Sequence, residues 1–157
     1  MRIALFDSGI GGLTVLSHAR RALPSEEFLF FADRDHVPYG TKSVPAVRGY
    51  VRAAFQFLVE QQKADAVVVA CNTATSVAVD EMRRLYDVPI IGMEPAVKKA
   101  LEQNSERRVL VTATPITING EKLHRLVSAY DTNGLVDLLA LPRLVEFAER
   151  REFVSAC

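Results

Sequence analysis

Cys71 stands where an apolar run meets a polar helix start, a position at which a thiol can do chemistry. Residues 66–70 (Ala-Val-Val-Val-Ala) precede it and predict a buried strand. Asn72 and Thr73 follow, and both are residue types that cap helix N-termini. Because the positive end of a helix favours a thiolate, one hypothesis is that Cys71 has a lowered pKa and acts as a base or nucleophile. The alternative is a small buried core residue, and this segment alone favours neither.

A glycine-rich loop follows the first predicted strand, at residues 7–12 (Asp-Ser-Gly-Ile-Gly-Gly). Its glycines would let backbone N–H groups approach an anion at a helix start, with Asp7 and Ser8 facing the same crevice. The spacing matches neither a dinucleotide-binding fingerprint nor a P-loop. A tight turn without a ligand would use similar residues, so the loop alone is weak support for a site.

A second polar loop, residues 36–40 (His-Val-Pro-Tyr-Gly), can cap a pocket or simply turn the chain, and the Pro and Gly favour the turn. The three histidines, His18, His36 and His124, are scattered and pair with no cysteine, so we expect no metal site. No lysine lies in a context that suggests a Schiff base.

The composition limits the classes of partner. Nineteen basic residues balance nineteen acidic ones in a chain of 157 residues, so no net field favours nucleic acid or an anionic membrane. No apolar run approaches the roughly 18 residues of a membrane span, and residues 1–7 do not form a signal peptide. Two cysteines do not make a disulfide framework, so we expect a cytoplasmic protein with reduced thiols.

Strand and helix patterns alternate along the chain, which predicts an α/β fold with a mainly parallel sheet and helices on both faces. The polar residues 104–108 are the expected boundary between a first domain, 1–103, and the start of a second, similar domain, 104–157. The second set contains too few elements to bury its sheet, so we expect it to be incomplete. The expected strands are residues 3–7, 28–32, 66–70, 89–93, 109–113 and 135–141, and the expected helices are 13–23, 44–62, 73–86, 95–103, 117–130 and 142–151.

Three motifs together resemble the amino-terminal portion of the bacterial glutamate racemases, within the aspartate/glutamate racemase family. They are residues 7–12, residues 38–40 (Pro-Tyr-Gly) and residues 71–74 (Cys-Asn-Thr-Ala), in this order and spacing. A looser resemblance continues through residues 113–117 and 141–145, so it covers nearly the whole chain.

The resemblance implies interconversion of L- and D-glutamate, which supplies D-glutamate for peptidoglycan, with neither pyridoxal phosphate nor a metal as cofactor. In this family two cysteines face opposite sides of the substrate α-carbon, one removing a proton and the other returning one. By the same resemblance Cys71 is the first of them and Asp7 assists it. The implied substrate contacts are Ser8, Tyr39, Gly40, Asn72 and Thr73.

The chain departs from the family pattern at the second cysteine. The family places that residue in a Gly-Cys-Thr-His motif, which this sequence lacks, and Cys157 follows Val-Ser-Ala instead. We therefore expect a racemase truncated before its second catalytic motif, with crippled activity. One alternative is a non-catalytic ligand-binding or regulatory remnant. Another is a homodimer in which symmetry brings two Cys71 thiols together.

Overall fold

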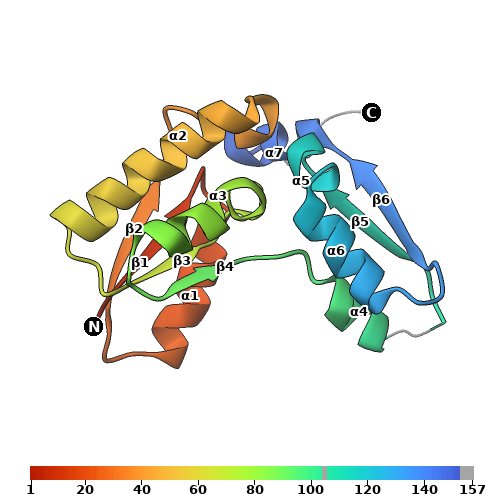
Figure 1. The fold of residues 1–157 in the computed structure, drawn as a ribbon, viewed down its shortest axis with the longest axis horizontal. Helices are drawn as coiled ribbons and strands as arrows, with labels where there is room; N and C mark the ends of the chain where they lie inside the picture. Colours follow the sequence, from red (N-terminus) through yellow and green to blue (C-terminus); the bar gives the residue numbers. More distant parts are fainter. Residues whose placement is uncertain (104–105, 153–157) are drawn as a thin grey trace.

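The computed structural model describes residues 1–103 and 106–152, which form two parallel sheets (Figure 1). The first sheet has the order β2-β1-β3-β4, and the second pairs β5 with β6. All neighbouring strands run parallel, which confirms the expected α/β class. The strands are β1 (Arg2–Asp7), β2 (Glu27–Ala32), β3 (Ala66–Val69), β4 (Ile90–Gly92), β5 (Val109–Ala113) and β6 (Val136–Ala140).

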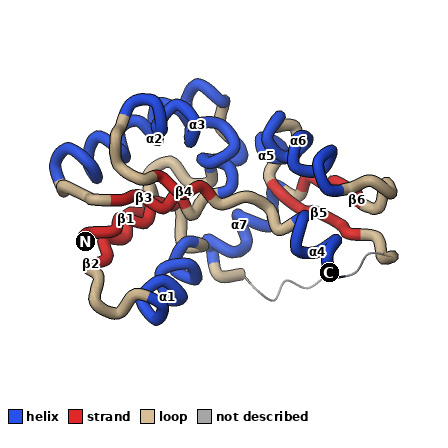
Figure 2. Tube along the Cα trace, turned by 60° about the horizontal axis from the view of Figure 1, so that its bottom comes forward, coloured by secondary structure: helices blue, strands red, loops and turns tan. Residues whose placement is uncertain are grey.

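Helices cover both faces of the first sheet (Figure 2). Helix α1 (Gly12–Ala22) lies on one face, whereas α2 (Val44–Phe55) and α3 (Asn72–Leu85) lie on the other. The helix expected over residues 44–62 divides, because a π-helical segment (Gln56–Gln61) continues α2. Alternate strand residues such as Phe6 and Val67 are fully buried against α2 and α3, so this face holds the main core.

The second sheet has its own smaller core. Val97 of α4 (Val97–Gln103) and Leu123 of α6 (Glu121–Tyr130) are buried with Val111 of β5. On the opposite face of this sheet, Leu110 and Leu139 are exposed. The boundary between residues 103 and 104 stays a prediction, and α4, which precedes it, packs with the second core.

The helix expected over residues 117–130 is interrupted. It forms α5 (Pro115–Ile118) and α6, with Asn119 and Gly120 between them. A Cβ at Gly120 would overlap the hydroxyl of Ser76 on α3. The break therefore lets α6 begin in close contact with α3.

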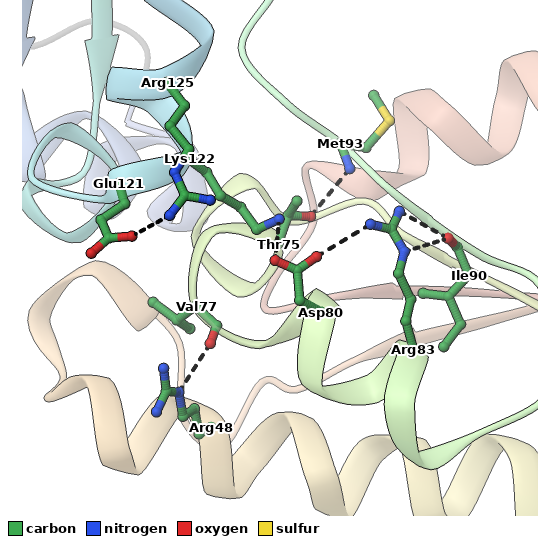
Figure 3. A network of polar contacts seen from close by, with 10 residues as sticks. All are labelled: Arg48, Thr75, Val77, Asp80, Arg83, Ile90, Met93, Glu121, Lys122 and Arg125. Atoms are coloured by element: carbon green, nitrogen blue, oxygen red, sulfur yellow. Dashed lines mark hydrogen bonds and ion pairs between the residues drawn. The ribbon is translucent and has the colours of Figure 1, made fainter.

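Polar contacts join the two sheets through α3 and α6 (Figure 3). Lys122 Nζ of α6 lies 2.7 Å from Asp80 Oδ2 of α3, and Arg83 reaches the other oxygen of Asp80. Lys122 holds the pKa of Asp80 below its usual range. These contacts bring the second sheet against the helix that follows Cys71.

Within the described ranges, no helix combines the length and the apolar content needed to cross a membrane.

Candidate active site

A pocket of about 380 Å³ lies at the carboxyl ends of β1 and β3. In the sheet, β1 lies between β2 and β3. The strand order therefore runs in one direction from β1 to β2 and in the opposite direction from β1 to β3 and β4. Ligands of open parallel sheets bind at such a switch point. Asp7 at the end of β1 and Ser8 after it line this pocket, together with Cys71 after β3 and Asn72 at the start of α3.

Cys71 is the N-cap of α3, whereas the sequence pointed to Asn72 or Thr73. Its backbone is extended, with φ −91° and ψ 118°, and its Sγ accepts the Ala74 N–H at 3.3 Å. The expectation of an Asn72 or Thr73 cap was wrong because the chain enters the helix one residue earlier. The same sulfur lies 3.5 Å from the Ser8 hydroxyl, so the thiol joins the loops after β1 and β3.

The surroundings of Cys71 raise its pKa, and the expected lowered pKa was wrong. Burial is the largest cause, since the residue is only 7% exposed, and the negative charge of Asp7 acts in the same direction. Hydrogen bonds from Ser8 and from the Ala74 N–H favour the thiolate and partly offset these effects. The helix N-terminus is present as expected, but desolvation outweighs it.

Asp7 holds the glycine loop. Its Oδ1 accepts the Ser8 N–H at 2.9 Å, and its Oδ2 accepts the Gly12 N–H at 2.7 Å. A Cβ at Gly12 would lie 2.9 Å from the Asp7 Cβ and 3.0 Å from the Ala70 Cβ, so a side chain would not fit there. The carboxylate thus fixes the start of α1 while its charge acts on Cys71.

Three of the expected substrate contacts do not line this pocket: Tyr39, Gly40 and Thr73. Tyr39 is 1% exposed and donates its hydroxyl to Asp33 Oδ2 at 2.6 Å. Burial and the hydrogen bond to Asp33 raise the pKa of Tyr39. Gly40 packs against Thr114, a residue that lines the pocket: a Cβ at Gly40 would lie 2.5 Å from Thr114 Cγ2.

Thr73 belongs to a buried cluster of three hydroxyls between the two sheets. Its Oγ1 lies 2.9 Å from that of Thr114 and 3.5 Å from that of Thr117, and the latter two are 3.2 Å apart. Thr114 also lines the pocket. The sequence marked this region only as a loose resemblance, because two threonines near a predicted strand end carry no pattern of their own.

Helix α7 (Pro142–Arg150) supplies the remaining wall, with Leu144, Val145, Ala148 and Glu149. The Glu149 carboxylate accepts the Ile10 N–H of the glycine loop at 3.0 Å. Sequence reasoning missed Glu149, because nothing local to residues 142–150 indicates contact with a loop 139 residues earlier.

The fold and the pocket define a class: an α/β protein with a parallel sheet, in which a buried thiol, a hydroxyl and a carboxylate meet at the switch point. Comparison with known proteins gives the family. The sequence matches the Asp/Glu/Hydantoin racemase family over residues 13–153. The chain therefore belongs to that family.

Its relatives include glutamate racemases. The chain is 54% identical to that of Campylobacter curvus over 98% of its length, and 53% identical to glutamate racemase 2 of Bacillus subtilis over 98%. It spans 59% and 58% of those two proteins.

Solved structures of glutamate racemases have a similar fold. Glutamate racemase from Campylobacter jejuni superposes with a TM-score of 0.86 at 33% identity, over 99% of this chain and 62% of that one. The Escherichia coli enzyme, in complex with L-glutamate and the activator UDP-MurNAc-Ala, gives a TM-score of 0.88 at 30% identity, over 99% and 58%.

Proposed function

We propose that this chain carries the first half of a glutamate racemase site and that Cys71 is its proton-transferring residue. The observation that carries the proposal is the position of the thiol in the switch-point pocket, with Ser8 within 3.5 Å. The product would be D-glutamate for peptidoglycan, made in the cytoplasm.

In this proposal the Cys71 thiolate removes the α-proton of D-glutamate. The Ser8 hydroxyl and the Ala74 N–H stabilise the thiolate, because both already bond to the sulfur. The negative charge of Asp7 destabilises the thiolate and so raises the pKa of Cys71. A smaller fraction of the thiol is then ionised, but the thiolate that forms is a stronger base. Asn72 contacts the substrate directly. Tyr39, Gly40 and Thr73 do not line the pocket. Gly40 and Thr73 act indirectly, by packing against Thr114, which does line it.

Inversion of the α-carbon also needs an acid on the opposite face. The sequence holds one other cysteine, Cys157, which lies outside the described residues. It does not match the second cysteine motif of the family. We therefore propose that these 157 residues alone racemise glutamate very slowly or not at all.

Alkylation of Cys71 tests whether glutamate occupies this pocket. In a Cys157→Ser background, iodoacetamide reports on Cys71 alone. Saturating D- or L-glutamate should slow its alkylation roughly tenfold or more. Aspartate, which is one methylene shorter, should protect less. Cys71→Ser is the control for background labelling. Equal labelling with and without glutamate would contradict the proposal.

A second candidate function is a ligand-binding remnant without catalysis. The raised pKa of Cys71 favours it, because a thiol that stays protonated is a poor base near neutral pH. Such a remnant would show protection by glutamate but no exchange of the substrate α-proton with solvent. Exchange that depends on Cys71 would exclude it.

A further inference from the structure

Strand β5 has a neighbouring strand on one edge only, within residues 1–103 and 106–152. That neighbour is β6, and the Val109 N–H donates to the Leu135 carbonyl at its start, at 2.8 Å. Because backbone groups of successive residues in a strand point to opposite edges, the N–H and C=O groups of Leu110 and Thr112 point away from β6. Both residues are exposed, so this edge can pair with a further strand.

A groove of about 450 Å³ runs along this free edge of β5. All five residues of β5 line the groove and no residue of β6 does, so it lies at the edge rather than on one face of the sheet. Val97 and Ala100 of α4, which lies beside β5 (Figure 2), and Val145 of α7 form the opposite wall. Among the described residues, none that lines the groove is charged. The groove therefore suits an apolar, uncharged segment, because a charged side chain would lose its water there without gaining a partner.

The first sheet shows how an edge of this kind is filled. β1 and β5 each pair in parallel with the next strand along the chain, β2 or β6, after a connection that contains a helix. On its other edge β1 pairs in parallel with β3, and the Ala70 N–H that follows β3 donates to the Phe6 carbonyl at 2.8 Å. β3 is short and uncharged (Ala-Val-Val-Val). The free edge of β5 thus corresponds to the edge of β1 that β3 occupies.

We propose that the groove beside β5 binds an extended, apolar polypeptide segment, which adds a strand parallel to β5. Its backbone pairs with Leu110 and Thr112, and its side chains pack against α4. The groove and the pocket of Cys71 share Thr112, Ala113 and Thr114, so the added strand ends beside that pocket. The proposal does not depend on glutamate being the ligand of the pocket.

A synthetic peptide with the sequence of residues 61–70 (Gln-Gln-Lys-Ala-Asp-Ala-Val-Val-Val-Ala) is the probe, because it contains the strand that fills the corresponding edge of β1. Fluorescence anisotropy of the labelled peptide should show saturable binding to the 157-residue chain. Hydrogen exchange of the Leu110 and Thr112 amides should slow in the complex. The amides of Leu138 and Ala140, at the outer edge of β6, should exchange at an unchanged rate.

Two N-methylated peptides separate strand pairing from simple apolar association. Methyl groups on the amides of Val67 and Val68 block both edges of the peptide strand and should weaken binding roughly tenfold or more, because hydrogen bonds to β5 are lost. The matched control carries the same two methyl groups at Gln62 and Lys63, ahead of the apolar run, and should bind like the unmodified peptide.

A pair of variants tests the same edge from the side of the protein. Leu110→Pro removes an N–H that points into the groove and spares the bonds between β5 and β6, so it should also weaken binding roughly tenfold or more. Leu138→Pro is the matched change at the outer edge of β6 and should not weaken it. Circular dichroism checks that both variants fold.

Three results would overturn the proposal. The first is equal binding of the two methylated peptides, which would mean that the peptide associates without pairing. The second is protection of Leu138 and Ala140 instead of Leu110 and Thr112, which would place the peptide on β6. The third is protection of Leu110 and Thr112 that rises with protein concentration in the absence of peptide, which would show that a second copy of the chain occupies this edge.

Discussion

Two features of the position of Cys71 have opposite effects on the pKa of its thiol. As the N-cap of α3 it accepts a backbone N–H, which favours the thiolate, but the cap position is buried, which favours the thiol. Burial prevails, and the charge of Asp7 adds to it. The position of Cys71 between a strand and a helix could be predicted from the sequence, because an apolar run and a helix start are local patterns. It could not predict the direction of the pKa, since burial and the proximity of Asp7 depend on the pairing of β1 with β3.

Removing the charge of Asp7 should lower the pKa of Cys71. The pKa is raised in the native protein, so the thiolate fraction grows only as the pH rises through alkaline values, and Asp7→Asn should move this profile to lower pH. A shift of about one unit would increase the rate of alkylation near neutral pH about tenfold. The measurement is the pH dependence of iodoacetamide reaction in a Cys157→Ser background.

The control for this change is Asp35→Asn, which removes the same charge at an exposed position. Circular dichroism checks that the glycine loop of Asp7→Asn keeps its fold, because the amide cannot replace both hydrogen bonds of the carboxylate. A profile that stays in place or moves to higher pH would show that Asp7 does not act on the thiol through its charge.

At the scale of elements, the contact between α3 and the start of α6 sets how closely the two sheets approach. Ser76 Oγ is buried there without a hydrogen-bond partner among the described residues, and Gly120 leaves just enough room for it. An unpaired buried hydroxyl costs free energy, so Ser76→Ala should leave the free energy of unfolding unchanged or raise it by about 1 kcal/mol.

Gly120→Ala should lower the free energy of unfolding by about 1–3 kcal/mol, because its new Cβ would overlap Ser76 Oγ. The double variant with Ser76→Ala should recover much of this loss, since the overlapping oxygen is gone. Urea unfolding of the four proteins measures the coupling. Simple additivity of the two changes would mean that the Ile116 and Thr117 carbonyls, not Ser76, exclude the side chain.

The strands were predicted more accurately than the helix details. Residues 3–7 and 109–113 are short apolar runs, and β1 and β5 follow them within a residue. The π-helical segment after Phe55 and the break at Gly120 arise from packing against other elements, so local periodicity cannot show them.

At the scale of the whole molecule, the site is shared between the two sheets. Cys71 and Asp7 come from the first, whereas Thr114 and Glu149 come from the second. The sequence predicted the first group, because its residues follow strong strand patterns. It marked Thr114 only through a loose resemblance and missed Glu149, because the contribution of both residues depends on how the second sheet docks against α3. Ile91 and Leu110 are both 58% exposed, so each sheet also keeps apolar surface at the solvent.

We propose above all that Cys71 exchanges the α-proton of glutamate, and that these 157 residues alone invert the α-carbon much more slowly than they exchange the proton. The most direct measurement is incubation of the 157-residue chain with D-glutamate in D₂O, following α-deuterium and chirality together. We predict slow deuterium incorporation that is lost in Cys71→Ala and kept in Cys157→Ser, with inversion slower than exchange by roughly 10²-fold or more. Exchange that persists in Cys71→Ala, or inversion by the chain at roughly 1 s⁻¹, would contradict the account.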